Sequence, residues 1–255
     1  MTNNNSKKQR FIRSNWILFV FILVLVIFAA LTGWISESLY QNNPADLIMK
    51  LKYYDFSLLV IIAPISLIVL ISSALGHKRA RIFSLGMSIY LTFTFGVTLF
   101  ISSQNSLFLV YVAIIILCMF YYIKGFLEIY NGTSLIIDKK ISKILSVVLL
   151  FSAISGFAYL LNDAINSLLI KRDEFDFLPV NPPQIFDMAI VLPFTIYGAI
   201  RLLISKKDGI LISFTAMIFF VFIGISVVTM DIAYAATTGT EIDHGKVYSY
   251  SFISM

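Results

Sequence analysis

The chain has 255 residues, of which 59% are hydrophobic and only 13% are charged, and its mean hydropathy is +0.89. Soluble domains carry roughly 25% charged residues, so this composition excludes a water-soluble globular protein and predicts an integral membrane protein. The net charge is +5, but the basic residues lie in short segments beside apolar runs and are not gathered on one folded face. We therefore exclude a nucleic-acid-binding protein.

Uncharged apolar runs predict seven membrane-spanning helices, because about 20 apolar residues cross a bilayer as a helix. The continuous runs do not fit the alternating pattern of transmembrane strands. The expected fold is an all-α, polytopic transmembrane helical bundle, with spans near residues 16–34, 57–75, 82–101, 107–123, 144–161, 185–204 and 209–230. The third and fourth spans share one uncharged stretch, and its polar break at residues 102–106 predicts a tight turn.

The distribution of basic residues predicts the orientation of these spans, since cytoplasmic loops carry an excess of Lys and Arg. An inside N-terminus and an outside C-terminus place 14 of the 19 basic residues on the cytoplasmic side. Residues 1–15 are then a basic cytoplasmic segment, 16–236 the transmembrane domain and 237–255 a polar external tail. In the outer loop 35–56, apolar side chains beside Lys50 and Lys52 suggest a segment lying on the membrane surface.

Sequence motifs of catalysis and cofactor binding are missing, including the P-loop, the zincin HExxH and the GxSxG elbow. The single cysteine, Cys118, lies in the fourth predicted span and excludes an internal disulfide. We expect no catalytic residue, cofactor or metal ligand set. Seven-helix receptors and retinal proteins are also excluded, because their N-terminus is external and a retinal Schiff base needs a lysine inside a span.

Four aspartates lie at the predicted outer ends of spans: Asp55, Asp163, Asp187 and Asp231. Asp187 is separated from Arg201 by uncharged helix about 20 Å long, which is shorter than the roughly 30 Å hydrocarbon layer. Because a short Asp side chain cannot reach out to water as Arg can, Asp187 is the group expected to need a partner or a water cavity. The alternative is structural: an Asp in the first helical turn interacts favourably with the helix dipole.

Prolines follow two of these aspartates inside helices, Pro64 after Asp55 and Pro193 after Asp187. Each proline removes a backbone donor and predicts a helix kink. The order of Asp, apolar turn, Pro and basic inner turn thus occurs twice and suggests a duplicated unit of the kind found in transporters. The alternative is that the prolines serve helix packing alone, because proline is common in membrane helices.

Three stretches resemble a group of uncharacterised bacterial multi-pass membrane proteins. They are residues 55–64 leading into the basic turn 77–81, the polar turn and helix start at residues 105–113, and residues 187–193 leading to Gly209. In place of that group's Trp-rich and Arg-rich variants, the chain carries Ile and Lys. The resemblance implies a plasma-membrane location and a multi-pass topology of about seven helices, and it adds no catalytic residue.

Three classes of function are compatible with these features. We favour a non-enzymatic membrane protein, a subunit or sensor, whose partners are the lipid bilayer and another membrane protein or a second copy of the chain. A small transporter or channel with an outward-facing carboxylate site is the first alternative, and an intramembrane lipid-modifying enzyme is the second. The candidate polar site comprises Asp187, Asp163, Asp231, Asp55, Asn105 and Tyr111.

Overall fold

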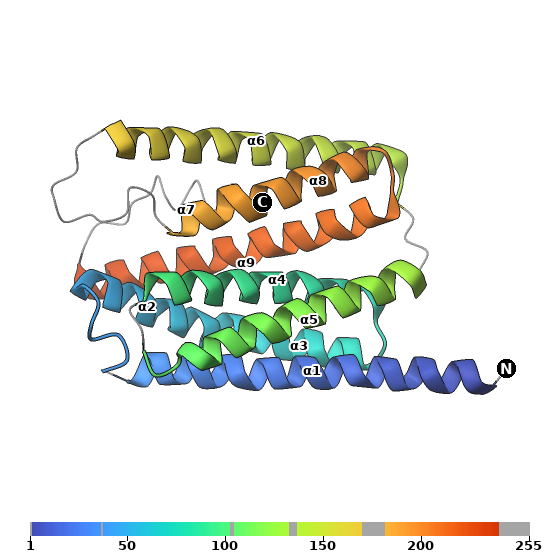
Figure 1. Cartoon of the computed structure of the whole chain (residues 1–255), viewed down its shortest axis with the longest axis horizontal. Coiled ribbons are helices and arrows are strands. Elements are labelled where there is room, and N and C mark those ends of the chain that lie inside the picture. The colour runs from blue at the N-terminus through green and yellow to red at the C-terminus, as the bar shows by residue number, and fades with distance from the viewer. Residues whose placement is uncertain (1, 37, 103–104, 133–136, 170–181, 240–255) are drawn as a thin grey trace. The chain divides into compact units, whose positions relative to one another are not determined.

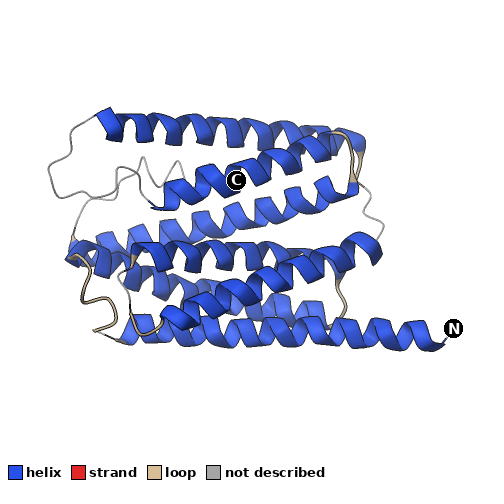
Figure 2. Ribbon diagram, viewed as in Figure 1, coloured by secondary structure: helices blue, strands red, loops and turns tan. Residues whose placement is uncertain are grey.

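The structure is a computed structural model that describes residues 2–36, 38–102, 105–132, 137–169 and 182–239. All regular secondary structure in these ranges is helical (Figure 2). Seven helical stretches are long and apolar enough to cross a membrane: Asn15–Ile35, Leu47–Ala74, Lys78–Ile101, Phe108–Gly132, Lys139–Asn162, Gln184–Leu203 and Lys207–Thr238. For the described part of the chain, the predicted all-α fold with seven spans is confirmed.

Figure 1 labels the α-helices along the chain. In chain order they are α1 (Thr2–Ile35), α2 (Ala45–Ser57), η1 (Leu58–Ile62), α3 (Ala63–Ala74), α4 (Lys78–Ile101), α5 (Phe108–Gly132), α6 (Lys139–Leu169), α7 (Pro182–Phe186), η2 (Asp187–Val191), α8 (Leu192–Leu203) and α9 (Lys207–Thr238). The chain divides into two compact units. The first comprises residues 1–131 and 217–255, and the second residues 132–216.

In the first unit, α4 is the most buried span, with 61% of its apolar window inside the protein. It contacts α3, while α1 contacts α2, η1 and α3. Small residues on α4, Ser84, Gly86 and Ser88, are buried, as is typical where membrane helices approach closely. On its other side, the rings of Phe83 and Phe222 meet edge to face at 5.5 Å and join α4 to α9.

Hydroxyl groups also connect the helices of the first unit. The Tyr90 hydroxyl on α4 lies 2.6 Å from Ser226 Oγ on α9, and the Tyr54 hydroxyl on α2 lies 3.0 Å from Thr94 Oγ1 on α4. Without water in the bilayer core, such groups must find partners inside the protein. These hydrogen bonds therefore fix which faces of α2, α4 and α9 point inward.

In the second unit, α6 packs along α8. The Ser142 hydroxyl on α6 donates to the Leu202 carbonyl oxygen on α8 at 2.6 Å. The turn from α8 to α9 contains Ser205 at a φ of 54°, and Gly209 follows at a point where a Cβ would overlap the backbone of Arg201. The turn can therefore close only with glycine at this position.

A π-helical turn precedes each of the two prolines singled out in the sequence. Leu58–Ile62 forms the first, immediately before Ala63 and Pro64, and Asp187–Val191 forms the second, immediately before Leu192 and Pro193. A proline inside a helix clashes with the carbonyl four residues earlier and leaves it without a donor. A wider turn accommodates both effects, and π-bulges are a recognised cause of helix bending.

The second span differs most from its predicted bounds. It begins at Leu47 rather than near residue 57, because α2 continues directly into η1 and α3. The segment expected to lie on the membrane surface is thus helical and continuous with the helix of the second span. The helix ends of α5 also extend past the prediction, to Gly132. Residues 170–181, which connect the fifth and sixth predicted spans, lie outside the described residues. So do residues 240–255, most of the predicted external tail.

Candidate functional site

A buried carboxyl group lies where α1 and α2 cross. Asp55 on α2 is only 6% exposed, and Gly33 on α1 faces it so closely that a Cβ on Gly33 would overlap the Asp55 carboxylate and lie 2.9 Å from the Tyr40 hydroxyl oxygen. The absence of a side chain at Gly33 therefore makes the space that the carboxyl group occupies. The ring of Trp34, the next residue on α1, lies 4.9 Å from the ring of Phe56 beside Asp55, tilted by 39°.

Two tyrosines and an asparagine extend this site. The Tyr40 hydroxyl donates to Asp55 Oδ2 at 2.8 Å and lies 3.3 Å from the Tyr111 hydroxyl. The side chain of Asn105 forms a hydrogen bond with Tyr111, and its Oδ1 also accepts the backbone N–H of Leu107 at 3.0 Å. Together we call Asp55, Tyr40, Tyr111 and Asn105 the Asp55 cluster.

Proton positions in the Asp55 cluster follow from the donor inventory of its members. A phenol has a single O–H, so when Tyr40 donates to an ionised Asp55 it must accept from Tyr111. A protonated Asp55 could instead donate to Tyr40, and each hydroxyl along the chain could reverse its direction. The cluster can therefore exist in two hydrogen-bond arrangements that differ by one proton at Asp55.

The Asp55 cluster lies in apolar surroundings. Tyr40 is 1% exposed; burial, and secondarily the nearby Asp55 carboxylate, raise the pKa of its phenol far above the ordinary value. Across the described residues, no lysine, arginine or histidine forms an ion pair with Asp55. The described residues also hold no group of three or more His, Cys, Asp or Glu placed to bind a metal ion. A proton or a single small cation is the charge that this site can accommodate.

Of the six residues in the predicted polar site, the structure brings three together: Asp55, Asn105 and Tyr111. Asp231 lies on α9, one turn before Tyr234, whose ring lies 5.6 Å from the Lys50 ammonium. Asp187 opens η2 in the second unit, where it is half-buried. Asp163 belongs to α6, and its side chain lies outside the described part.

Sequence reasoning missed Tyr40 and Gly33. Tyr40 falls in a segment interpreted as an outer loop, where a buried aromatic residue is not expected. A usable signal was present for Gly33, the only glycine of the first predicted span, because a lone glycine in an apolar helix often marks a close approach.

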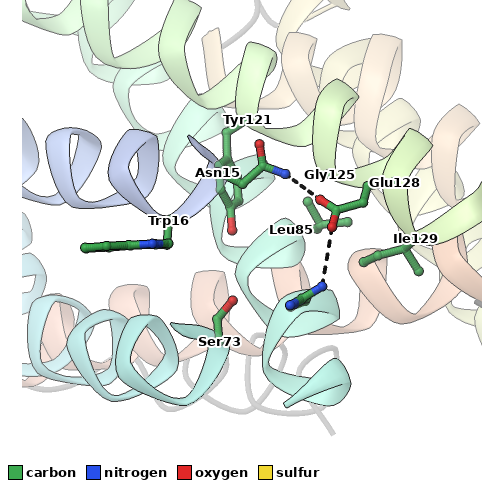
Figure 3. Close-up of a pocket in the computed structure, with 9 residues that line it drawn as sticks. Asn15, Trp16, Ser73, Leu85, Tyr121, Gly125, Glu128 and Ile129 are labelled. Carbon is green, nitrogen blue, oxygen red and sulfur yellow. Dashed lines mark hydrogen bonds and ion pairs between the residues drawn. The ribbon is translucent and has the colours of Figure 1, made fainter. Parts of the chain in front are cut away.

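A second polar cluster lies at the other end of the first unit. Glu128 follows Tyr111 on α5 by about 25 Å of helix. Its carboxylate accepts a hydrogen bond from Asn15 Nδ2 at 2.5 Å and pairs with Arg81 Nη1 at 3.4 Å, as Figure 3 shows for the labelled Asn15 and Glu128. Glu128 therefore connects α1, α4 and α5 at this end.

In the second unit, Arg201 forms a two-pronged ion pair with Asp208. Arg201 Nε lies 2.7 Å from Asp208 Oδ2, and Arg201 Nη2 lies 2.9 Å from Oδ1. Asp208 thus neutralises Arg201, the basic residue at the end of the short span that begins at Asp187. The need of Asp187 for a partner or a water cavity, which we expected from that spacing, is therefore reduced.

Comparison of the chain with protein-family models, with curated proteins and with solved structures finds no match. The functional class therefore comes from the fold itself. Seven apolar helices of spanning length are compatible with a multi-pass integral membrane protein.

Proposed function

We propose that this chain is a non-enzymatic, sensor-like membrane protein in which Asp55 binds and releases a proton. The observation that carries the proposal is the burial of this carboxyl group with Tyr40 as its hydrogen-bond donor. Ionisable groups inside membrane spans are costly and commonly mark proton or ion sites. The proton would alter the direction of hydrogen bonds through Tyr40 and Tyr111, and hence the contacts between α1, α2 and α5.

Trp34 offers a direct readout of this change, since its ring contacts Phe56 beside Asp55. The chain contains two tryptophans, so a Trp16→Phe background isolates the emission of Trp34. Infrared difference spectroscopy from about pH 4 to pH 10, a range bounded by the ordinary pKa values of an Asp carboxyl and a phenol, reports the carboxylic C=O band. We expect one band to titrate in step with Trp34 emission and to vanish in Asp55→Asn.

Asp208→Asn is the matched control for this experiment, because Asp208 is held ionised against Arg201 and its replacement should leave the band intact. A spectrum without a pH-dependent carboxylic band, or a band that persists in Asp55→Asn, would show that Asp55 is not the proton-binding group. The proposal of a proton sensor would then be wrong.

Proton-coupled transport is a second candidate, supported by the repetition of Asp, π-turn and proline in both units. Interrupted helices in corresponding positions are typical of transporters built from repeats. Proteoliposomes loaded with a pH-sensitive dye distinguish the candidates. A proton flux that is lost in both Asp55→Asn and Asp187→Asn would favour transport, whereas titration of Trp34 without flux would favour the sensor.

We further propose that the protein resides in a bacterial plasma membrane with its N-terminus in the cytoplasm. The support is the resemblance of three stretches to bacterial multi-pass proteins and the excess of Lys and Arg in alternate connections. Cysteine-accessibility labelling tests the orientation in a Cys118→Ala background. A cysteine at exposed Lys140 should react only from the cytoplasmic side, and one at exposed Asn42 only from the outside.

A further inference from the structure

A small pocket at the end of the first unit opposite the Asp55 cluster has the features of a ligand site (Figure 3). We call it the Glu128 pocket. It is formed by α1 at Asn15 and Trp16 and by the neighbouring ends of α3, α4 and α5, and its polar lining consists of Asn15, Ser73, Arg81, Tyr121 and Glu128. Asn15 and Lys78 open two of the spanning stretches, so the pocket lies at the level of a membrane surface.

One side of the Glu128 pocket offers hydrogen-bond acceptors. Asn15 donates its Nδ2 to Glu128, but its Oδ1 is buried and has no hydrogen-bond partner among the described residues. A buried acceptor without a partner costs about 1–3 kcal/mol, so the arrangement favours a ligand that brings an N–H donor. The neighbouring Glu128 carboxylate would favour a donor with positive charge.

The other side of the Glu128 pocket offers cationic donors. The Arg81 side chain is 24% exposed and meets Glu128 through one terminal nitrogen at 3.4 Å, a long contact for a charge-assisted hydrogen bond. Arginine has five N–H donors, so Arg81 retains capacity for an anion. The pocket thus pairs an anion-binding side with a cation-binding side.

Apolar groups complete the lining in a way that suits a lipid. Trp16 is 37% exposed, and Figure 3 shows its ring extending to one side of the polar groups, while Leu85 and Ile129 flank Glu128. Tryptophan is enriched at the membrane–water interface, where its ring lies at the level of the headgroups. A ligand whose headgroup enters the pocket can therefore leave its acyl chains against the apolar helix surface.

We propose that the Glu128 pocket binds the headgroup of an aminophospholipid of the phosphatidylethanolamine class. The primary ammonium donates to Asn15 Oδ1 and to Glu128, and the phosphate accepts from Arg81. A phosphatidylcholine headgroup has the same charges but no N–H donor, and phosphatidylglycerol has the phosphate without the ammonium. The site should therefore discriminate among lipids by hydrogen bonding, independently of the proposed role of Asp55.

The test measures lipid binding to the full-length, delipidated protein in detergent. Each of the three lipids is titrated, with the midpoint of thermal unfolding and native mass spectrometry as readouts. We expect phosphatidylethanolamine to bind about tenfold more tightly than phosphatidylcholine, the difference corresponding to one hydrogen bond with a charged partner. Equal binding of the two lipids would overturn the proposal.

Variants identify the groups responsible. Asn15→Leu removes the unpartnered oxygen while keeping a similar volume, and Glu128→Gln removes the charge; each should abolish the preference for phosphatidylethanolamine. Arg79→Gln, on the same turn but outside the pocket lining, is the matched control and should keep it. If Glu128→Gln does not fold, Asn15→Leu still decides, because it leaves the ion pair between Arg81 and Glu128 in place. A preference that survives in Asn15→Leu would overturn the assignment.

Soluble phosphoethanolamine separates the lipid from a free metabolite with the same headgroup chemistry. The lipid proposal predicts no thermal stabilisation by this compound at concentrations that far exceed those of the lipid, since the acyl chains supply much of the binding free energy. Stabilisation by phosphoethanolamine comparable with that by the lipid would show that the occupant is a free metabolite, contrary to the proposal.

Discussion

The two proline-containing helices share a sequence pattern but place their aspartates in different surroundings. In α2–η1–α3, Asp55 lies before the π-turn, is almost fully buried and accepts a hydrogen bond from Tyr40. In α7–η2–α8, Asp187 is itself the first residue of the π-turn and is half-buried. The spacing between Asp and Pro, nine residues in one helix and six in the other, rotates the two carboxyl groups to different positions relative to the bend.

The basic ends of these two regions differ as well. Arg201 is neutralised locally, by Asp208 across a tight turn. Arg81 instead meets Glu128, a residue far along the chain on α5, and the contact is longer. In the second unit, the ion pair thus forms within one helical hairpin. In the first unit, the ion pair joins helices that are distant in the sequence. This contrast is why we place both candidate sites in the first unit.

The largest expected effect comes from filling the space between α1 and Asp55. Gly33→Ala introduces a Cβ that would overlap the Asp55 carboxylate, and overpacking of this kind costs about 3 kcal/mol. The free energy of unfolding, measured by SDS titration in mixed micelles, should fall by that amount. Gly132→Ala, where a Cβ meets nothing within 4 Å, should change it by less than about 0.5 kcal/mol.

A double-mutant cycle sharpens this prediction. Asp55→Ala removes the atoms that the new Cβ would overlap, so Gly33→Ala should cost much less in that background. Equal costs of Gly33→Ala with and without Asp55 would contradict the packing described here.

Removing hydroxyl groups one at a time tests whether the hydrogen bonds of the Asp55 cluster contribute unequally to the free energy of unfolding. Tyr40→Phe leaves a buried carboxyl group without its donor and should cost about 2 kcal/mol. Tyr111→Phe leaves that donor in place and removes the long bond to the Tyr40 hydroxyl and the bond to Asn105, so it should cost about 1 kcal/mol. Tyr53→Phe, whose hydroxyl bonds to exposed Thr237, is the control and should be nearly neutral. The same SDS titration measures all three, and equal costs would argue against the cluster.

The fold could be predicted from the sequence because lipid imposes simple rules. Seven apolar runs of spanning length are visible without any tertiary information, and the structure contains seven helices of that kind within the described residues. The exception is instructive: Lys50 and Lys52 interrupt hydropathy near the start of the second span, but α2 continues through them. Long cationic side chains can reach out toward polar groups from a helix end, so their presence does not end a span.

The candidate site could be predicted only in part. Asp55 was visible as a charge beside an apolar run, and Asn105 and Tyr111 as polar residues at a turn. What the sequence could not show is that a tyrosine from the connection after α1 turns inward to the same point. Likewise, the pairing of Asn15, Arg81 and Glu128 depends on α1, α4 and α5 meeting at one point, which hydropathy does not specify.

A smaller effect is expected in the second unit, where the ion pair between Arg201 and Asp208 is partly exposed. Asp208→Asn keeps the shape but removes the charge, and solvent screening limits the cost to about 1 kcal/mol. Lys206→Gln removes an exposed charge in the same turn and should leave the free energy of unfolding unchanged. A cost for Asp208→Asn as large as that of Tyr40→Phe would remove the distinction between a local pair in the second unit and a buried network in the first.

The smallest expected effect is a dependence of stability on alkaline pH through Tyr40. Burial raises the pKa of this phenol in the folded protein, while in the unfolded chain it ionises near pH 10. Below that value both states hold the proton, and the stability contribution of Tyr40 is complete. Above it the unfolded state loses the proton first, so the free energy of unfolding falls as pH rises. Over the alkaline range in which Asp55 stays ionised, the stability difference between the wild type and Tyr40→Phe should be constant up to about pH 10 and shrink by less than about 1 kcal/mol half a pH unit higher. A difference that stays constant there would show that Tyr40 ionises as readily in the folded protein as in the unfolded chain.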